Sequence, residues 1–243
     1  MVGPRQRQPE ERRPAEVVVP QLSQQEIERR ANAGYDRAVA GILAPQIRQL
    51  QTDLATLRNL ILQRQRALPV DASDSARSTA LDAAITAFSE NNLNSPLGRY
   101  ISTGATDFIR NFTWDIRGGR ISFSLDMDRA PVESWLARPL QQAREGVVRQ
   151  IVAASEPVGT ARSRKNYALL EGLDPALVQQ LGTGLSRELG IGPNQTIPRN
   201  HLPITVAYTD SAPVMDSRGR VLRHVVGLIA EYAGPRPVTE VNM

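Results

Sequence analysis

A heptad stripe of aliphatic side chains near the amino end constrains this chain more than any other feature of its sequence. The stripe steps by three and four residues and is broken only at Arg64. Such spacing gives a helix a narrow apolar seam, which stays in water unless a second helix or a second copy of the chain covers it. Leu60 and Leu62 widen the seam, which favours a bundle or a trimer-like assembly. The residues predicted to make oligomer contacts are Ile47, Leu50, Leu54, Leu57, Leu60, Ile61 and Leu68.

Arg64 stands where the heptad pattern requires an apolar residue. One interpretation is a buried polar layer that fixes the register and the number of subunits. The other is a helix end that frays near Pro69, with the guanidinium reaching water. Long cationic side chains reach solvent easily near helix ends, so the second interpretation is favoured.

Capping residues predict where the helical region begins. Ser23 and Glu26 are the first and fourth residues of a capping box, and Leu22 and Ile27 occupy the staple positions around it. Pro45 would cost about 3 kcal/mol inside an unbroken helix. We therefore expect a kink, or a second helix that begins at this proline.

The chain is predicted to have three parts and an α+β fold. Residues 1–20 are rich in Pro, Arg, Glu and Gln and reach an apolar run only at Val17–Val19. They should form a flexible arm, either an unanchored tail or a segment that orders against a neighbouring subunit through those valines. Residues 21–69 are predicted to form a kinked helical or coiled-coil oligomerisation stalk. Residues 70–243 are predicted to form a smaller α+β head with an extended carboxyl-terminal tail.

A β-hairpin is the clearest feature of the predicted head. Apolar and polar residues alternate on both sides of Gly118–Gly119, a two-residue turn that sets the register of the strands. In that register every apolar side chain falls on one face. The predicted pairs are Ile116 with Ile121, Trp114 with Phe123 and Phe112 with Leu125.

Helices and strands are predicted in the rest of the head. Apolar spacing predicts a helix over 76–88, a second from Pro131 with a kink or restart at Pro139, and a third that Asp174–Pro175 caps. Alternation predicts a strand over 204–209. A turn over 216–219 leads to a long β-branched run, 221–232, that suits a central strand.

Composition limits the possible functions. The chain has no cysteine, which excludes disulfides and thiolate chemistry. No run approaches the roughly 18 apolar residues of a membrane span, and the amino end lacks the apolar run of a signal peptide. We therefore expect a soluble protein with no membrane partner, located in a virion or in a cytoplasmic assembly.

Positive charge is concentrated at the amino end. Residues 1–70 hold 11 arginines against 7 acidic residues, whereas the remainder is balanced. Lys165 is the only lysine among the 29 basic residues. The arginine bias either serves bidentate contacts with phosphate or carboxylate or reflects a GC-rich genome.

Acidic and histidine residues give little reason to expect a metal site or catalysis. Asp115, Asp126 and Asp128 share a hairpin and could hold a hard cation, but a solvated face is the favoured explanation because such a cation needs more oxygens. His201 and His224 lack any ligand spacing, and a triad cannot be recognised without geometry. No metal, cofactor or catalytic residue is predicted, and the chain is predicted not to be an enzyme.

Two glycine-containing or basic segments suggest ligand binding at first sight. Gly182-Thr183-Gly184 lies inside a helical pattern and so fails the context of a nucleotide-binding turn. Arg162, Arg164, Lys165 and Tyr167 form a basic segment with an aromatic neighbour, which either contacts nucleic acid weakly or is a solvated loop.

The sequence thus favours a non-enzymatic structural subunit of a homo-oligomer. Among such assemblies a virion component, such as a phage capsid, tail or adaptor protein, suits a basic arm, a helical stalk and an extended tail by analogy of architecture. Its partners would be further copies of the chain and neighbouring structural proteins. The alternative is a nucleic-acid-associated adaptor that uses the arginine-rich arm and the basic segment at 162–165.

Overall fold

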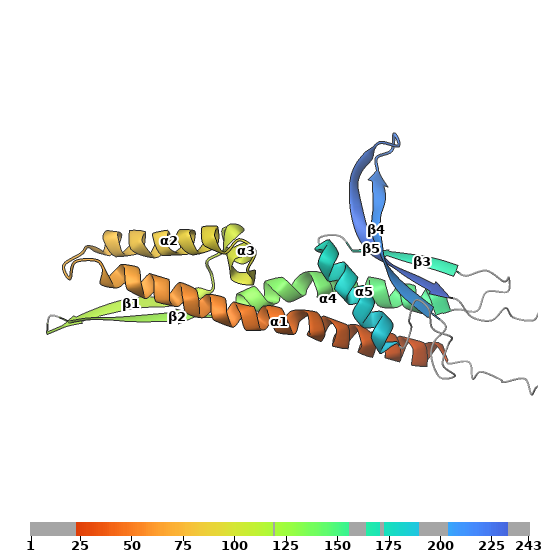
Figure 1. Cartoon of the computed structure of the whole chain (residues 1–243), viewed down its shortest axis with the longest axis horizontal. Coiled ribbons are helices and arrows are strands. Elements are labelled where there is room, and N and C mark those ends of the chain that lie inside the picture. The colour runs from red at the N-terminus through yellow and green to blue at the C-terminus, as the bar shows by residue number, and fades with distance from the viewer. Residues whose placement is uncertain (1–22, 119, 156–163, 171–172, 190–203, 233–243) are drawn as a thin grey trace, which may run out of the picture.

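The protein has an α+β fold built along one long helix (Figure 1). The computed structural model describes residues 23–118, 120–155, 164–170, 173–189 and 204–232. The described helices are α1 (Gln24–Arg66), α2 (Asp74–Asn91), α3 (Pro96–Ser102), α4 (Ala130–Ser155) and α5 (Pro175–Glu188). The described strands are β1 (Ile109–Arg117), β2 (Arg120–Met127), β3 (Arg164–Leu169), β4 (Ile204–Met215) and β5 (Val221–Tyr232).

Helix α1 begins at the predicted cap. The Ser23 hydroxyl accepts a hydrogen bond from the backbone N–H of Glu26 at 3.3 Å. The carboxylate of Glu26 is bound by the guanidinium groups of Arg29 and Arg30, and these hydrogen bonds lower its pKa to about 2. The Leu22 half of the predicted staple lies outside the described residues.

A single helix runs through Pro45, where two helices or a kink were predicted. It spans 43 residues, or about 64 Å at 1.5 Å per residue. Proline removes the N–H that would bond to the carbonyl of Gly41, four residues earlier. Both residues are exposed, so water can bind the freed carbonyl. Water on the exposed side of α1 therefore replaces the hydrogen bond that Pro45 cannot donate. Packing on the buried side of α1 keeps the helix continuous. Helix α4 likewise continues through Pro139, where a kink or restart was predicted.

The carboxyl-terminal half of α1 builds the first of two cores. Helices α2 and α3 lie along one side of it and the β1–β2 hairpin along another (Figure 1). The first turn of α4 closes this core through Val132. Its buried members are Leu50, Leu57, Ile61, Ala84, Ile85, Phe88, Leu97, Tyr100, Ile101, Phe108, Leu125 and Val132.

The amino-terminal half of α1 builds the second core with α4, α5 and the three-stranded sheet. Tyr35 is buried there and donates a hydrogen bond to the carbonyl of Leu140 in α4. An ion pair of 2.9 Å between Arg37 and Glu188 links α1 to α5 at the surface. Because α1 and α4 contribute to both cores, the predicted stalk and head are packed together along one helix.

The β1–β2 hairpin has the predicted register. Ile116 pairs with Ile121, Trp114 with Phe123 and Phe112 with Leu125. Leu125 is fully buried, and the polar residues that alternate with the apolar ones are exposed. Gly118 has φ +57°, a left-handed conformation that glycine adopts without strain. Gly119, the second turn residue, lies outside the described residues.

The second sheet has the order β3-β5-β4, and all of its pairings are antiparallel. The long run over Val221–Tyr232 is its central strand, as predicted. Its pairing with β4 has register shifts between Thr209 and Ala212 and between Val214 and Met215. Beyond the end of β3, the β4–β5 ribbon projects away from the helices (Figure 1).

No helix in the described part of the chain is both long enough and apolar enough to cross a membrane.

Candidate functional site

The heptad seam of α1 faces the interior of its own chain. Leu50, Leu57 and Ile61 are fully buried. Ile47, Leu54, Leu60 and Leu68 are partly buried, and Leu54 and Leu60 pack against the carboxyl-terminal core. The covering side chains come from α2, α3 and the hairpin, for example Phe88, Leu97 and Leu125.

This burial removes the physical reason for assigning those seam residues to an oligomer interface. A heptad seam needs a cover, and here other elements of the same chain supply it. The three fully buried residues are out of reach of a second copy in this conformation. An assembly built from this fold would have to make its contacts without these three residues.

Arg64 behaves as the favoured interpretation predicted. Its side chain is exposed in the last turn of α1. The buried polar residue at this end of the helix is its neighbour Gln65, whose amide nitrogen donates to the backbone carbonyl of Arg77 at 2.6 Å.

Arg77 of α2 is a fully buried cation that the sequence analysis missed. Its Nη2 atom donates to the carbonyls of Pro69 and Val70 at 3.2 Å each. Its guanidinium carbon lies 5.5 Å from the ring centre of Trp114 and 5.7 Å from that of Phe123. The guanidinium thus ties the α1–α2 connection to the aromatic face of the hairpin, where cation–π attraction stabilises it.

The spacing of α2 contained a signal for this position. Arg77 precedes Leu81 by four residues, Ala84 by seven and Phe88 by eleven, so it lies on the apolar face of the helix. A charged residue on such a face is often read as the edge of the stripe. Here its Nε and Nη1 atoms are buried without a hydrogen-bond partner among the described residues.

Asp53 is a second buried charged residue that was missed, and it lies in α1 between Leu50 and Leu57. Its carboxylate accepts the amide of Gln49 at 2.9 Å and the backbone N–H of Leu97 at 3.2 Å. The second bond satisfies a free N–H in the first turn of α3. Asp53 therefore holds α3 against α1, which is a structural role.

Tyr100 of the carboxyl-terminal core forms a hydrogen-bonded pair with the exposed Asp107. The Tyr100 hydroxyl donates to the carboxylate of Asp107. Burial, together with this hydrogen bond, raises the pKa of Tyr100 to about 12. A phenol so reluctant to ionise would be a poor general base near neutral pH.

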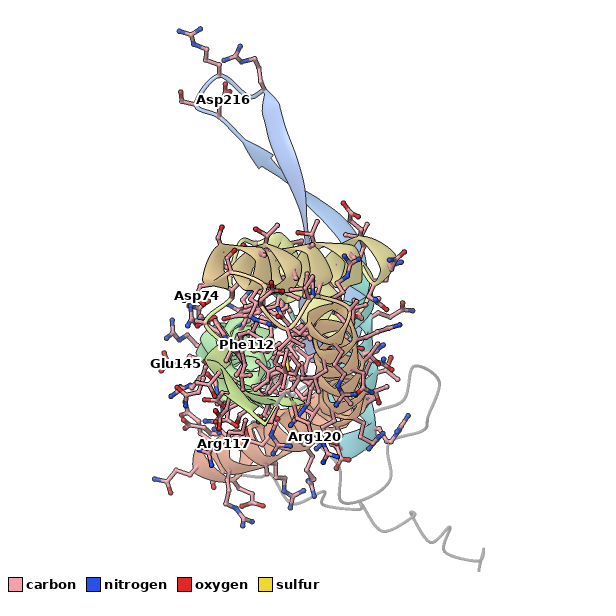
Figure 2. The ribbon with its side chains drawn as sticks, turned by 90° about the vertical axis from the view of Figure 1, so that its left-hand side faces the viewer. Asp74, Phe112, Arg117, Arg120, Glu145 and Asp216 are labelled. Atoms are coloured by element: carbon pink, nitrogen blue, oxygen red, sulfur yellow. The ribbon has the colours of Figure 1, made fainter. Side chains whose placement is uncertain are left out.

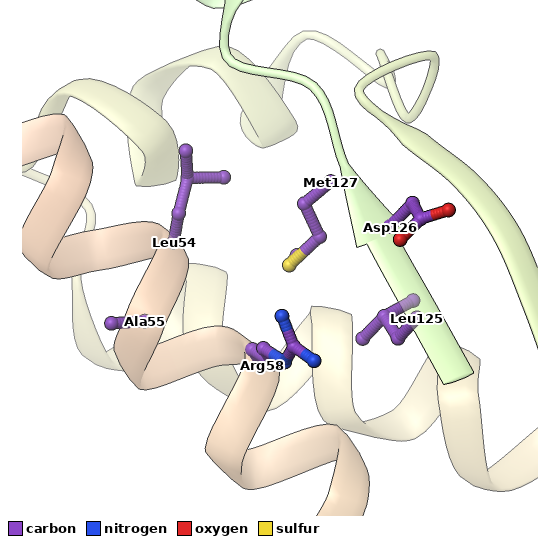
Figure 3. Close-up of a pocket in the computed structure, with 6 residues that line it drawn as sticks. All are labelled: Leu54, Ala55, Arg58, Leu125, Asp126 and Met127. Atoms are coloured by element: carbon purple, nitrogen blue, oxygen red, sulfur yellow. The ribbon is translucent and has the colours of Figure 1, made fainter. Parts of the chain in front are cut away.

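A shallow pocket of about 360 Å³ lies between α1 and β2 (Figure 3). Its lining residues are Leu54, Ala55, Arg58, Leu125, Asp126 and Met127. The Arg58 side chain reaches from α1 toward β2, while the Asp126 carboxylate turns away from it (Figure 3). The lining is apolar apart from these two side chains and brings no nucleophile beside a base.

Two of the three acidic residues considered as cation ligands on the hairpin are paired with arginines. Asp115 pairs with Arg117 at 2.5 Å and Asp128 with Arg110 at 2.9 Å. Asp128 also accepts the backbone N–H of Ala130 at the start of α4. In the parts of the chain that the structure describes, no three acidic, histidine or cysteine side chains gather as metal ligands would.

The predicted basic loop is partly a strand. Arg164, Lys165 and Tyr167 belong to β3, whose backbone pairs with β5, while Arg162 lies outside the described residues. The strand was missed because its first half is polar, which resembles a loop. Of the two histidines, His224 lies in β5 opposite Pro213, and His201 lies outside the described residues.

The Gly182–Gly184 segment lies within α5, as its helical context predicted. A Cβ atom on Gly184 would lie 2.9 Å from the Cβ of Ala38 in α1. The absence of a side chain thus lets α5 approach α1 closely, so this glycine serves packing.

The projecting β4–β5 ribbon ends in a hydrogen-bonded turn. The Asp216 carboxylate accepts backbone N–H groups of Arg218 and Arg220 at 2.9 Å each, and these bonds lower its pKa. Gly219 has φ +75°, which suits its place in the turn. Figure 2 shows Asp216 at the tip, well away from the helices.

No protein-family model matches the chain, and comparisons with curated proteins and with solved structures found no match either. The functional interpretation therefore depends on the fold and its surfaces alone.

Proposed function

We propose that the protein is a non-enzymatic structural subunit of a homo-oligomeric assembly, and specifically a virion component such as a phage capsid, tail or adaptor protein. The observation that carries this proposal is the shape of the molecule. Two hydrophobic cores lie one after the other along α1, a helix of 43 residues, and the β4–β5 ribbon projects from the side of the molecule (Figure 1). Such a shape presents much surface and exposed strand edges for the volume that it encloses.

The long helix supports this role in a different way from the one first expected. Its seam is covered by α2, α3 and the hairpin, so α1 acts as a rigid spine within each subunit. In this proposal the amino-terminal arm, residues 1–20, and the projecting ribbon make the contacts between subunits. Arms that cross to a neighbour are a common way to join elongated subunits, and this supports the virion analogy at the level of architecture only.

Assembly is tested with the purified full chain. Sedimentation velocity over a wide concentration range should reveal species larger than one chain, and electron microscopy of the largest species should show a regular particle, ring or filament. A chain that lacks residues 1–20 should keep its circular dichroism spectrum and lose the large species. A full chain that stays a monomer at every concentration would contradict the proposal.

A nucleic-acid-associated adaptor is the alternative function, and its basis is the charge of the arm and of 162–165. Binding that depends on phosphate contacts weakens steeply with salt. Retention of DNA or RNA near 200 mM salt would favour the adaptor, whereas binding only below about 50 mM would make the charge incidental.

A further inference from the structure

One stretch of the edge of the central strand pairs with no strand in the described part of the chain. Strand β3 pairs with β5 only from Gly227 to Tyr232. Among the described residues no strand continues the line of β3 beside Arg223–Val226. This stretch, Arg223–Val226, is called the slot, and it lies in the ribbon that projects from the helices (Figure 1).

The backbone groups in this slot point outward. Pro213 of β4 pairs with His224 of β5. Proline has no N–H to give, so this pair is of the non-hydrogen-bonded kind. In an antiparallel ladder the N–H and C=O of such residues point away from the partner strand. The peptide groups of His224, and of Val226 two residues on, therefore point away from β4 and can bond to an added strand.

The opposite edge of the ribbon is protected. Strand β4 carries Pro213, and a register shift lies on each side of it. Nearer the helices the Ser186 hydroxyl of α5 donates to the carbonyl of Val206 at 2.6 Å. Proline and bulges are devices by which edge strands avoid pairing. The slot on β5 contains no proline. A register shift at Leu222 marks its end nearest the tip of the ribbon.

We propose that Val17–Val19 of one copy add as a strand to the β5 edge at Arg223–Val226 of a second copy. This inference rests on the proposed function and names the contact that the arm would make. The three valines are the only apolar run in residues 1–20, and β-branched residues suit a strand. Glu16, directly before them, is opposite in charge to Arg223 of the slot. Backbone pairing at a sheet edge gives affinity, and side-chain fit gives specificity.

The short connection between Val19 and the start of α1 requires that the added strand come from another copy of the chain. Helix α1 begins at the end of the sheet where β5 finishes (Figure 1). His224 lies eight residues back along β5 from Tyr232, or about 26 Å at 3.3 Å per residue. Only four residue steps separate Val19 from Ser23, which span at most about 14 Å. A chain cannot place its own valines in its own slot, so each copy would donate its arm to the next.

The test compares the mass of the full-length protein with that of four single variants. Val18→Pro removes an N–H from the proposed strand of the arm, and His224→Pro removes one from the slot on β5. Val18→Ile and His224→Val are matched controls that keep the backbone N–H. We expect both proline variants to weaken association by about tenfold or more, equivalent to about 1.4 kcal/mol, and both controls to match the parent.

Cross-linking locates the contact independently of any loss of stability. The chain has no cysteine, so a Val18→Cys chain mixed with a His224→Cys chain gives one defined pair. A bifunctional thiol reagent with a short spacer should join the two variants. A mixture of Val18→Cys with Thr56→Cys, exposed on α1, should not be joined.

The outcomes separate this inference from the proposed function. An oligomer that persists unchanged in both proline variants would overturn the strand pairing and leave the structural role standing. An oligomer that depends on Val18 but gives no link to position 224 would also overturn it, because the arm would then bind elsewhere. A parent protein that is monomeric throughout would overturn both.

Discussion

Leu57 offers the sharpest test of how the seam of α1 is covered. Its side chain is fully buried in the carboxyl-terminal core, among apolar neighbours from the same chain. Truncating a buried leucine to alanine removes its transfer free energy and leaves a cavity, at a combined cost of 2.7–5.0 kcal/mol in the best-studied series. We expect Leu57→Ala to lower the free energy of unfolding by about 3 kcal/mol, a large share of the roughly 5–15 kcal/mol typical of a folded protein.

Urea unfolding followed by circular dichroism measures this loss. Thr56→Ala is the matched control, because Thr56 is exposed on the same turn and should change stability by no more than about 0.5 kcal/mol. If other elements of the same chain cover the seam, the loss for Leu57→Ala is the same at every protein concentration. A loss that appears only at high concentration would mean that a second copy covers Leu57, since association stabilises by mass action. An unaltered unfolding midpoint would likewise refute the packing.

Three further variants or conditions test particular contacts. Gly184→Ala should destabilise by about 1–3 kcal/mol in thermal unfolding because its Cβ would crowd Ala38, whereas Gly41→Ala, with open space around it, should stabilise slightly. Arg77→Ala should cost about 2–4 kcal/mol in urea unfolding, through the lost stacking on Trp114 and a new cavity; Arg77→Met, which fills that space, should cost less. Stability should fall as pH rises from 10 to about 12, because folded Tyr100 keeps its proton while an unfolded tyrosine loses it; a Tyr100→Phe protein should lose this part of the dependence.

Elements whose local signals agree with each other were predicted correctly from the sequence. In the β1–β2 hairpin, the glycine turn and the alternation of apolar residues specify the same register, and the structure has it. The caps at Ser23 and Asp174 mark the starts of α1 and α5 for the same reason, since side-chain oxygens there accept backbone N–H groups.

Elements that depend on distant contacts could not be predicted in this way. The heptad stripe indicates that one face of α1 must be covered. It does not indicate whether the same chain or a second copy provides the covering side chains. Helix α3 has only seven residues, too few for a periodic pattern, and it is fixed by the bond from Leu97 to Asp53 of α1. Strand β3 is likewise defined by its pairing with β5 and not by its own composition.

The buried charged residues show the same limit. Arg77 and Asp53 stand at positions that periodicity assigns to the interior, where charged residues are rarely found unless they are bonded. Their distant hydrogen-bond partners are backbone groups: the carbonyls of Pro69 and Val70 for the arginine and the N–H of Leu97 for the aspartate, which also accepts the nearby amide of Gln49. Backbone partners leave no mark in the sequence, so only the fold reveals why these positions tolerate a charge.

Hydrogen exchange along α1 tests most directly whether the spine is internal to each subunit. The backbone N–H groups of residues 50–61 should exchange slowly, and their protection should stay constant when the protein is diluted until its sedimentation coefficient is that of one chain. Protection that disappears on dilution together with the oligomer would mean that a neighbouring copy supplies the cover, and the account of α1 as a self-covered spine would be wrong.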